Sequence, residues 1–334
     1  MSIPPPDASI VIPSYRHAAY VEAAVRSALA CDRRGAGGPA VEVVVVDDGS
    51  DDGSLVILRR LEHTIGDPTR LRVAAQENAG AHVAITRGLD AARGEILFIL
   101  DSDDLFEPER VATLLACFDD PRTMLAASWL CIVDADDAEL GVKHAWRDLP
   151  PWPRPRPGPH VDDLDDPELS LLASNWVATT SNLALRRSLL ERLRFQPLRY
   201  AHDWAFLLEA CRHGRLAAVE EPLVRYRVHE SNTLRETDRA EAGGRALMHF
   251  EILWLLARHA DETVRRVADR LDRPLDTLWR RVWRSLPRFG AESLLVELLA
   301  LRGDRPSVPM AYDALLDPEH PLRRQALRKL AEAA

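Results

Sequence analysis

Residues 95–108 read EILFILDSDDLFEP, an apolar run that passes directly into an acidic turn. Such a run is typical of a strand covered on both faces, as in a parallel sheet. Asp101, Asp103 and Asp104 follow it at once. Neighbouring carboxylates repel one another, and a divalent cation such as Mg²⁺ or Mn²⁺ would hold them together through oxygen ligation. A solvated turn or a helix N-cap is the alternative, because Asp-Asp pairs recur along this chain.

The sequence before this stretch alternates strand-like and helix-like segments. Apolar residues recur at helical spacing over residues 20–29 and, more loosely, over 83–92. Strands alternating with helices predict an α/β fold, with a Rossmann-like, mostly parallel sheet flanked by helices. The predicted strands cover residues 9–13, 41–46, 71–75 and 95–100.

Polar residues gather where these strands end. In an open parallel sheet, ligands bind beyond the carboxyl ends of the strands, so these segments are expected to converge on one crevice. An acidic turn at residues 47–50 could accept hydrogen bonds from a nucleobase or a ribose, or could be a plain Asp-Gly turn. The segments are Pro13-Ser14-Tyr15, Asp47-Asp48-Gly49-Ser50, Asn78-Ala79-Gly80 and Asp101-Ser102-Asp103-Asp104.

Composition excludes several classes of protein. The net charge of −9 disfavours a protein that coats nucleic acid. The four cysteines are far apart, so neither a zinc site nor a redox pair is encoded. Only Lys143 and Lys329 are lysines, and neither lies in a Gly-rich loop, which rules out a P-loop. Without a long apolar run or a signal-peptide pattern, the chain is expected in the cytoplasm.

The later sequence changes character twice. Residues 124–146 predict two more strands, and the proline-rich stretch 150–159 predicts a stiff loop. Helical and strand segments resume over 168–228, and the pattern is helical beyond about residue 238. Nine arginines and five acidic residues lie between residues 258 and 288, together with Trp279 and Trp283. This mixture suggests peripheral membrane contact, an oligomer interface, recognition of an acidic acceptor, or a solvated face.

The quoted motifs, taken in order, resemble family 2 glycosyltransferases with the GT-A fold. The likeness is strong over residues 8–130 and moderate over 170–235. It implies a catalytic domain over residues 1–235, with a nucleotide-sugar half (8–130) and an acceptor half (131–235), followed by a helical domain over 236–334. The implied reaction is the inverting, metal-dependent transfer of a sugar, of the hexosyltransferase class. The implied donor is a UDP-, GDP- or TDP-sugar. The implied acceptor is a hydroxyl of a saccharide, a lipid-linked molecule or a small molecule, in glycoconjugate synthesis.

The resemblance also assigns site residues. Arg87 departs from the family pattern, which often has asparagine there, and could alter phosphate contacts. The implied metal ligands are Asp101, Asp103, Asp104 and His229, with the aspartate that binds directly left open. The implied nucleotide-sugar contacts are Pro13, Ser14, Tyr15, Asp48, Asn78, Gly80, Arg87, Asp101, Ser102, Asp103 and Arg227.

Two further motifs lie in the acceptor half. The segment AHDW, residues 201–204, is similar to the family's acidic base motif, which implies that Asp203 is the general base for the acceptor hydroxyl. An N-cap aspartate is the alternative. The segment YRVHESN, residues 226–232, resembles the family's Y-R-x-H segment and implies phosphate contact by Arg227 and metal or phosphate contact by His229. The alternatives are that His229 is a structural histidine, or that His202 takes its role.

Two other functions compete with transfer. Nucleotide-sugar pyrophosphorylases use a similar sheet, but they need a Gly-rich loop with Arg and Lys where this chain reads PSYRHAAY. The other alternative is a binding module that has the fold but catalyses no reaction. Its weakness is that every charged residue proposed for the site is present.

Overall fold

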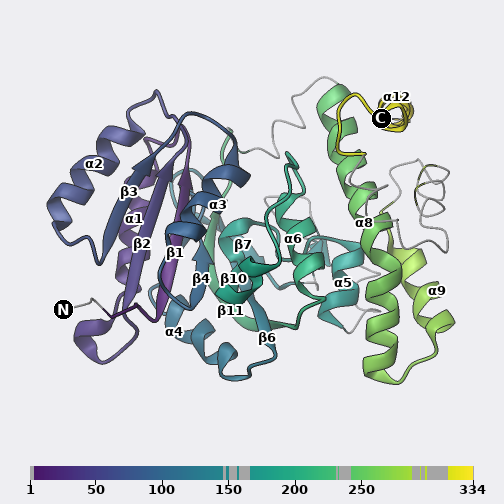
Figure 1. Ribbon diagram of the computed structural model, residues 1–334, viewed down its shortest axis with the longest axis horizontal. Coiled ribbons are helices and arrows are strands. Elements are labelled where there is room, and N and C mark those ends of the chain that lie inside the picture. Colours follow the sequence, from purple (N-terminus) through teal and green to yellow (C-terminus); the bar gives the residue numbers. More distant parts are fainter. Residues whose placement is uncertain are drawn as a thin grey trace. The chain divides into compact units, whose positions relative to one another are not determined.

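The computed structural model describes residues 4–145, 148–149, 156–157, 166–230, 232, 242–287, 294, 298 and 315–333 (Figure 1). The chain forms two compact units. The first comprises Met1–Pro157, Val177–Phe195 and Ala210–Val228. The second comprises Gly158–Trp176, Gln196–Glu209 and His229–Ala334, so the chain passes between the units several times.

The first unit is built on a nine-stranded sheet of mixed direction. Its strand order is β3-β2-β1-β4-β10-β6-β11-β5, and β7 pairs with β6 at one side. A separate two-stranded ribbon joins β8 (Asp148–Leu149) to β9 (Arg156–Pro157). The strands of the large sheet are β1 (Ala8–Ser14), β2 (Val41–Asp47), β3 (Leu71–Ala75), β4 (Ile96–Ile99), β5 (Leu105–Phe106), β6 (Thr123–Val133), β7 (Glu139–Lys143), β10 (Ala184–Arg186) and β11 (Arg215–Arg227).

The parallel core of this sheet confirms the expected α/β fold. Strands β3, β2, β1 and β4 run parallel, and β1, β2 and β4 are buried along their whole length. Pro13 is tolerated in β1 because the pairing with β4 ends at Val11, so no ladder hydrogen bond to β4 needs its missing N–H. All four strands therefore deliver their carboxyl ends to one edge.

Helices cover both faces of this core. Side chains of α1 (Val21–Ala30), α2 (Ser54–Ile65) and α4 (Arg110–Leu115) join the cluster on one face with Ile10 and Ile12. Helix α3 (Ala81–Ala91) packs on β1 and β2 through the other face, against Val11. A Cβ added at Gly88 in α3 would lie 2.3 Å from Val11 Cγ1, so only glycine permits this close approach.

The second half of the sheet departs from a purely parallel arrangement. β10 is antiparallel to both β4 and β6, and β5 and β7 also pair antiparallel, whereas β6 and β11 are parallel. A three-residue strand such as β10 leaves no periodic signal, which is why its insertion could not be predicted. The two strands expected within 124–146 are confirmed as β6 and β7. Of the proline-rich stretch, all but Arg156 and Pro157 lies outside the described residues.

The second unit is helical, as predicted for the C-terminal region. Arg266 and Arg270 of α8 form ion pairs with Glu168, and Arg270 also pairs with Asp166, the N-cap of α5. Among the described helices, none combines the length and apolar composition of a bilayer-spanning segment. Among the described residues, the helices are α5 (Pro167–Ala173), α6 (His202–Ala210), α8 (Ala242–Leu271), α9 (Leu275–Ser285) and α12 (Pro321–Ala333).

Candidate functional site

The loop after β1 connects the two acidic turns of the first unit. The His17 backbone N–H donates to Ser54 Oγ at 3.1 Å, at the start of α2, and the Ala18 N–H donates to Asp52 Oδ2 at 2.9 Å. His17 Nδ1 lies 2.8 Å from Ser102 Oγ, in the turn after β4. The segments that follow β1, β2 and β4 are therefore joined by direct contacts at one edge of the sheet.

Tyr15 and Ser14 differ in exposure at this edge. The Tyr15 side chain is 39% exposed and lies under the Arg16 guanidinium, 5.1 Å from the ring centroid. The Ser14 side chain is buried, and its Oγ has no hydrogen-bond partner among the described residues. An open aromatic ring and an unused hydroxyl are groups that a ligand can contact.

Asp48 is buried and organises the neighbouring loop. Its Oδ1 accepts hydrogen bonds from Gln76 Nε2 at 2.7 Å and from the Ala79 N–H at 2.9 Å, while Oδ2 accepts the Gly80 N–H at 2.9 Å. The exposed Asn78 donates from Nδ2 to the Asp48 carbonyl at 3.1 Å. Asp48 thus fixes the loop that carries Asn78 and Gly80.

Arg87 reaches the same loop from α3. Its Nη1 donates to the Ala75 carbonyl at 3.0 Å and to Gln76 Oε1 at 3.2 Å. Because Gln76 in turn donates to Asp48, the Arg87 side chain supports the turn through Gln76.

The three aspartates after β4 have different surroundings. Asp101 accepts hydrogen bonds from the hydroxyls of Thr179 and Thr180 at 2.9 and 2.6 Å. Asp104 is fully buried and accepts from Ser181 Oγ at 2.6 Å and from the Arg227 N–H at 2.8 Å. Burial, followed by the charges of Asp103 and Asp101, raises the pKa of Asp104 well above its ordinary value.

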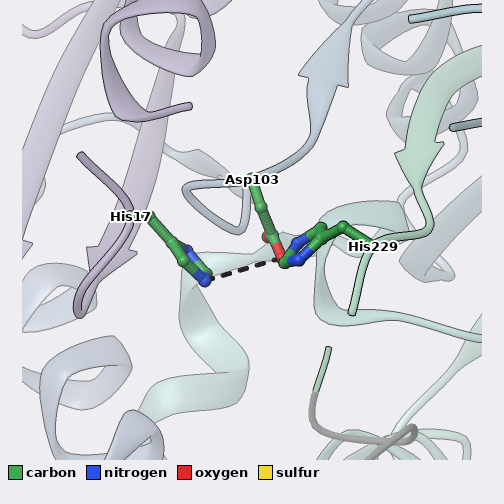
Figure 2. A group of neighbouring side chains, drawn as sticks. All are labelled: His17, Asp103 and His229. Atoms are coloured by element: carbon green, nitrogen blue, oxygen red, sulfur yellow. Dashed lines mark ion pairs between the residues drawn. The ribbon is translucent and has the colours of Figure 1, made fainter. Parts of the chain in front are cut away.

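Asp103 has two histidines beside it. His17 Nε2 lies 3.8 Å from Asp103 Oδ2. His229 directly follows Val228, the last residue of the first unit, and one ligand atom from each of His17, Asp103 and His229 lies within 4.8 Å of the other two. Figure 2 shows the three side chains pointing toward one another. Two imidazole nitrogens and one carboxylate oxygen form a donor set that suits a divalent cation such as Mn²⁺ better than Mg²⁺, which prefers oxygen alone.

His17 was missed by sequence reasoning, although it lies in the quoted segment PSYRHAAY. The Ser102 hydroxyl beside Nδ1 orients its ring. When Nδ1 carries the proton and donates to Ser102, Nε2 keeps its lone pair on the side of Asp103, an arrangement common to metal-binding histidines. Its position shortly after the end of β1, at the ligand-binding edge, was the available signal.

Arg227 is buried and fully engaged within the first unit. Its Nε donates to the Asp103 carbonyl at 2.8 Å, its Nη1 to the Asp134 and Ala135 carbonyls, and its Nη2 pairs with Asp137 Oδ1 at 2.7 Å. The guanidinium also lies over the Tyr20 ring, at 4.9 Å from the centroid. These contacts hold the backbone of the acidic turn at Asp103.

Asp203 lies in the second unit, near the start of α6. It is the second residue of α6, not the N-cap. Its Oδ2 accepts a hydrogen bond from Asn175 Nδ2 at 2.8 Å, and Oδ1 accepts the Trp204 N–H at 2.7 Å. Burial raises the pKa of the Asp203 carboxyl above its ordinary value, although His202 and these hydrogen bonds act in the opposite direction. A buried carboxylate with a raised pKa is suited to proton abstraction.

Residues 9–194, more than half of the chain, match the sequence profile of glycosyl transferase family 2. The chain belongs to this family. The match spans the parallel core and the acidic turns after β2 and β4, but it ends before α6 and all of the C-terminal helices.

Curated relatives of this family 2 chain are glycosyltransferases or polysaccharide-synthesis proteins. It is 27% identical to an uncharacterised glycosyltransferase of Nostoc sp. over 228 residues, which are 67% of this chain and 65% of that protein. It is 34% identical to the succinoglycan biosynthesis protein ExoO of Rhizobium meliloti over 135 residues, 40% of this chain and 36% of that protein. In both comparisons the chain covers less than two thirds of the relative.

Solved structures share the fold of the family 2 chain. S. aureus TarS 1–349 in complex with UDP-GlcNAc superposes with a TM-score of 0.59 at 18% identity, covering 98% of this chain and 90% of that one. The mannosyltransferase PcManGT from Pyrobaculum calidifontis, in complex with GDP-Man and Mn²⁺, gives a TM-score of 0.54 at 19% identity, covering 99% and 86%. The chain therefore has the GT-A fold.

Proposed function

We propose that this chain is an inverting glycosyltransferase that moves a sugar from a nucleoside diphosphate sugar to an acceptor hydroxyl in polysaccharide or glycolipid synthesis. The observation that carries the proposal is the joining of the strand ends around His17, Ser102 and Asp103. In a sheet of this type, ligands bind at this edge. The complexes of TarS with UDP-GlcNAc and of PcManGT with GDP-Man support a nucleotide sugar as the donor.

We propose that His17, Asp103 and His229 hold a divalent cation, with Asp101 and Asp104 supporting the turn. A bound cation would neutralise the charge that develops on the leaving diphosphate. The Mn²⁺ in the PcManGT complex supports this cofactor, and the two imidazoles favour Mn²⁺ over Mg²⁺. We assign Asp103 to the cation. Both carboxylate oxygens of Asp104 accept hydrogen bonds, from Ser181 and from Arg227, and the Asp101 carboxylate accepts hydrogen bonds from two threonines.

The remaining assignments divide between the donor and the acceptor. Tyr15, with Pro13 and Ser14 beside it, and the loop of Asn78 and Gly80 fixed by Asp48 would contact the base and ribose. Arg87 would support the loop of Asn78 and Gly80 through its contact with Gln76, and Arg227 would support the acidic turn through the Asp103 carbonyl. The oxygen of the acceptor hydroxyl would attack the anomeric carbon while the bond from the sugar to the diphosphate breaks. Asp203 would take the proton from that hydroxyl. Direct displacement of this kind inverts the configuration and needs no covalent intermediate.

A donor panel tests the proposal. The full chain is mixed with UDP-, GDP- and TDP-sugars and Mn²⁺, with saccharide and lipid-linked acceptors, and release of nucleoside diphosphate and sugar transfer are measured. At least one donor should give transfer with inverted configuration. Asp203→Asn should abolish that transfer while nucleotide binding stays within about twofold, because the two roles are separate. Binding of nucleotide sugar without any turnover of the wild type would support a binding module instead.

Metal removal tests the cofactor separately. Treatment with EDTA should abolish transfer and weaken nucleoside diphosphate binding, and Mn²⁺ should restore both. The His63→Ala variant, which removes an exposed histidine of α2, should behave like the wild type. Full activity in the presence of EDTA would overturn the cation assignment.

We further propose that the chain works in the cytoplasm and docks on the inner, anionic face of the membrane through α9. Trp279 and Trp283 lie one turn apart and are partly exposed, and with Arg280 and Arg284 they line a surface hollow of about 350 Å³. Arg280 and Arg284 are exposed, so both charges can reach lipid phosphates. Tryptophan and arginine on one helix face suit the membrane interface.

Vesicle sedimentation tests this docking. The protein should pellet with vesicles containing phosphatidylglycerol but not with pure phosphatidylcholine, and high salt should release it. Trp279→Ala with Trp283→Ala should abolish pelleting. Arg265→Ser, which removes a paired arginine of α8, should not. A dimer that dissociates on the tryptophan substitutions, without vesicle binding, would overturn docking in favour of an oligomer interface.

A further inference from the structure

Glu251, in the long C-terminal helix α8, binds the backbone immediately before α6. Its Oε1 accepts the Arg199 N–H at 2.9 Å, and its Oε2 accepts the N–H groups of Tyr200 and Ala201 at 2.8 and 3.1 Å. The Glu251 side chain is buried, with 3% of its surface exposed. One carboxylate from elsewhere in the chain therefore satisfies three consecutive amides that lead into the helix carrying Asp203.

The position of this carboxylate is favourable for the helix. The three amides belong to residues 199–201, just before α6, whose N-terminus carries partial positive charge, so a carboxylate beside it stabilises the helix start. Both Glu251 and Asp203 lie close enough to His202 for its charge to lower their pKa values, whereas burial raises both. Glu251 accepts the N–H of Ala201, two residues before Asp203, so both buried carboxylates lie at the beginning of α6.

A second, longer contact lies near the far end of α6 and involves the same helix. His259 of α8 lies with Nδ1 3.6 Å from Glu209 Oε2, one residue before α6 ends. Glu251 and His259 are eight residues apart, about 12 Å along a helix, which matches the distance from Ala201 to Glu209 along α6. Helix α8 therefore contacts α6 near both ends, and of these two contacts the one made by Glu251 adjoins Asp203.

We propose that Glu251 is a positioning residue for the acceptor-side base, which makes the C-terminal helical region a working part of the transferase. This inference rests on the proposed role of Asp203. The residues that carry it, from the segment 196–209 and from α8, all lie beyond the part that matches the family profile, residues 9–194. Glu251 does not touch the reacting atoms; it sets the start of α6 and with it the place of the Asp203 carboxylate.

Glu251→Gln is the informative variant, because it keeps the volume and the burial of the side chain. The amide keeps one acceptor oxygen and turns an NH₂ group toward amides that need an acceptor. We expect kcat for nucleoside diphosphate release to fall about 10- to 100-fold, as small misplacements of catalytic groups cause. The Kd for Mn²⁺-UDP or Mn²⁺-GDP should stay within about twofold. Hydrogen exchange should quicken at residues 199–204.

His259→Gln is the matched control, since it perturbs the same helix pair at the other end. It should lower thermal stability while leaving kcat within about twofold. Equal losses of kcat in both variants would reduce Glu251 to a structural role and overturn the inference. Wild-type kcat in Glu251→Gln would do the same.

Asp203→Asn, measured in parallel, separates this inference from the proposed function. Loss of turnover in Asp203→Asn with full turnover in Glu251→Gln overturns the positioning role alone. Retained turnover in Asp203→Asn overturns the base assignment, and the inference that depends on it falls as well. Loss in both, with His259→Gln near wild type, supports both.

Discussion

Asp104 accepts the backbone N–H of Arg227 at 2.8 Å, although 123 residues separate the two in the sequence. Its other oxygen accepts the Ser181 hydroxyl at 2.6 Å. Asp104→Asn keeps one acceptor oxygen and places an NH₂ group against a buried donor. We expect the free energy of unfolding in urea to fall by about 1–3 kcal/mol, the cost of a buried unsatisfied polar group. An unchanged urea midpoint would contradict the structural role of Asp104.

Asp103→Asn should behave in the opposite way. The Asp103 contact that holds the turn uses its backbone carbonyl, which the substitution leaves in place. We expect the unfolding free energy to change by less than about 0.5 kcal/mol. Mn²⁺ affinity, measured by calorimetry, should fall at least about 10-fold. Unchanged Mn²⁺ affinity would exclude Asp103 as a ligand.

Ser102 should influence the cation without touching it. Its hydroxyl lies 2.8 Å from His17 Nδ1 and orients the imidazole. Ser102→Ala should weaken Mn²⁺ binding about 10- to 100-fold, as the loss of an outer partner of a ligating histidine typically does. The comparison is Ser174→Ala, which removes a hydroxyl whose oxygen has no hydrogen-bond partner among the described residues. Equal Mn²⁺ affinities in these two variants would contradict the orienting role of Ser102.

The sequence predicted the ligand-binding edge but not how its side chains are used. Apolar runs ending in polar turns are local signals, and β1 to β4 follow them closely. The hydrogen-bond partners of these side chains are not local in the sequence. Ser181 Oγ accepts the Asp101 N–H and donates to Asp104, and it lies about 80 residues away from both. Nothing near Ser181 in the sequence distinguishes it from other serines.

The acceptor side was harder to predict for a similar reason. The motif around Asp203 resembled the family, but the residues that hold it come from other segments. Asn175 lies 28 residues before Asp203, and Glu251 contacts residues 50 to 52 positions earlier in the chain. Buried polar partners at such separations leave no periodic pattern, so only the folded chain brings them together.

Gly88→Ala tests the packing of α3 on the sheet. Alanine favours a helix by about 1 kcal/mol over glycine, but its Cβ would lie 2.3 Å from Val11 Cγ1. Overpacking costs about 1–3 kcal/mol, so after the helix gain is subtracted we expect net destabilisation of up to about 2 kcal/mol in urea unfolding. Gly35→Ala, where an added Cβ meets no atom within 4 Å, should be neutral within about 0.5 kcal/mol. Greater stability of Gly88→Ala would contradict the close approach.

Asn175→Ala tests the protonation state of Asp203. The hydrogen bond from Asn175 stabilises the Asp203 carboxylate, whereas burial, the largest effect, raises the pKa of that carboxyl. A base must be deprotonated, so turnover should rise with pH through an apparent pKa above the ordinary aspartate value. Without the Asn175 hydrogen bond the charged form of Asp203 is less stable. The acid side of the pH profile of kcat should therefore move to higher pH by about one unit.

The measurement is the pH dependence of kcat at saturating Mn²⁺ and donor, for the wild type, Asn175→Ala and Ser174→Ala. The proposed cation site is the same in all three proteins, so the difference between the acid sides of their pH profiles isolates the environment of Asp203. Ser174→Ala changes the neighbouring residue without removing a hydrogen bond to Asp203 and should keep the wild-type profile. An acid side that moves to lower pH in Asn175→Ala, or that does not move, would show that another group limits turnover at acid pH.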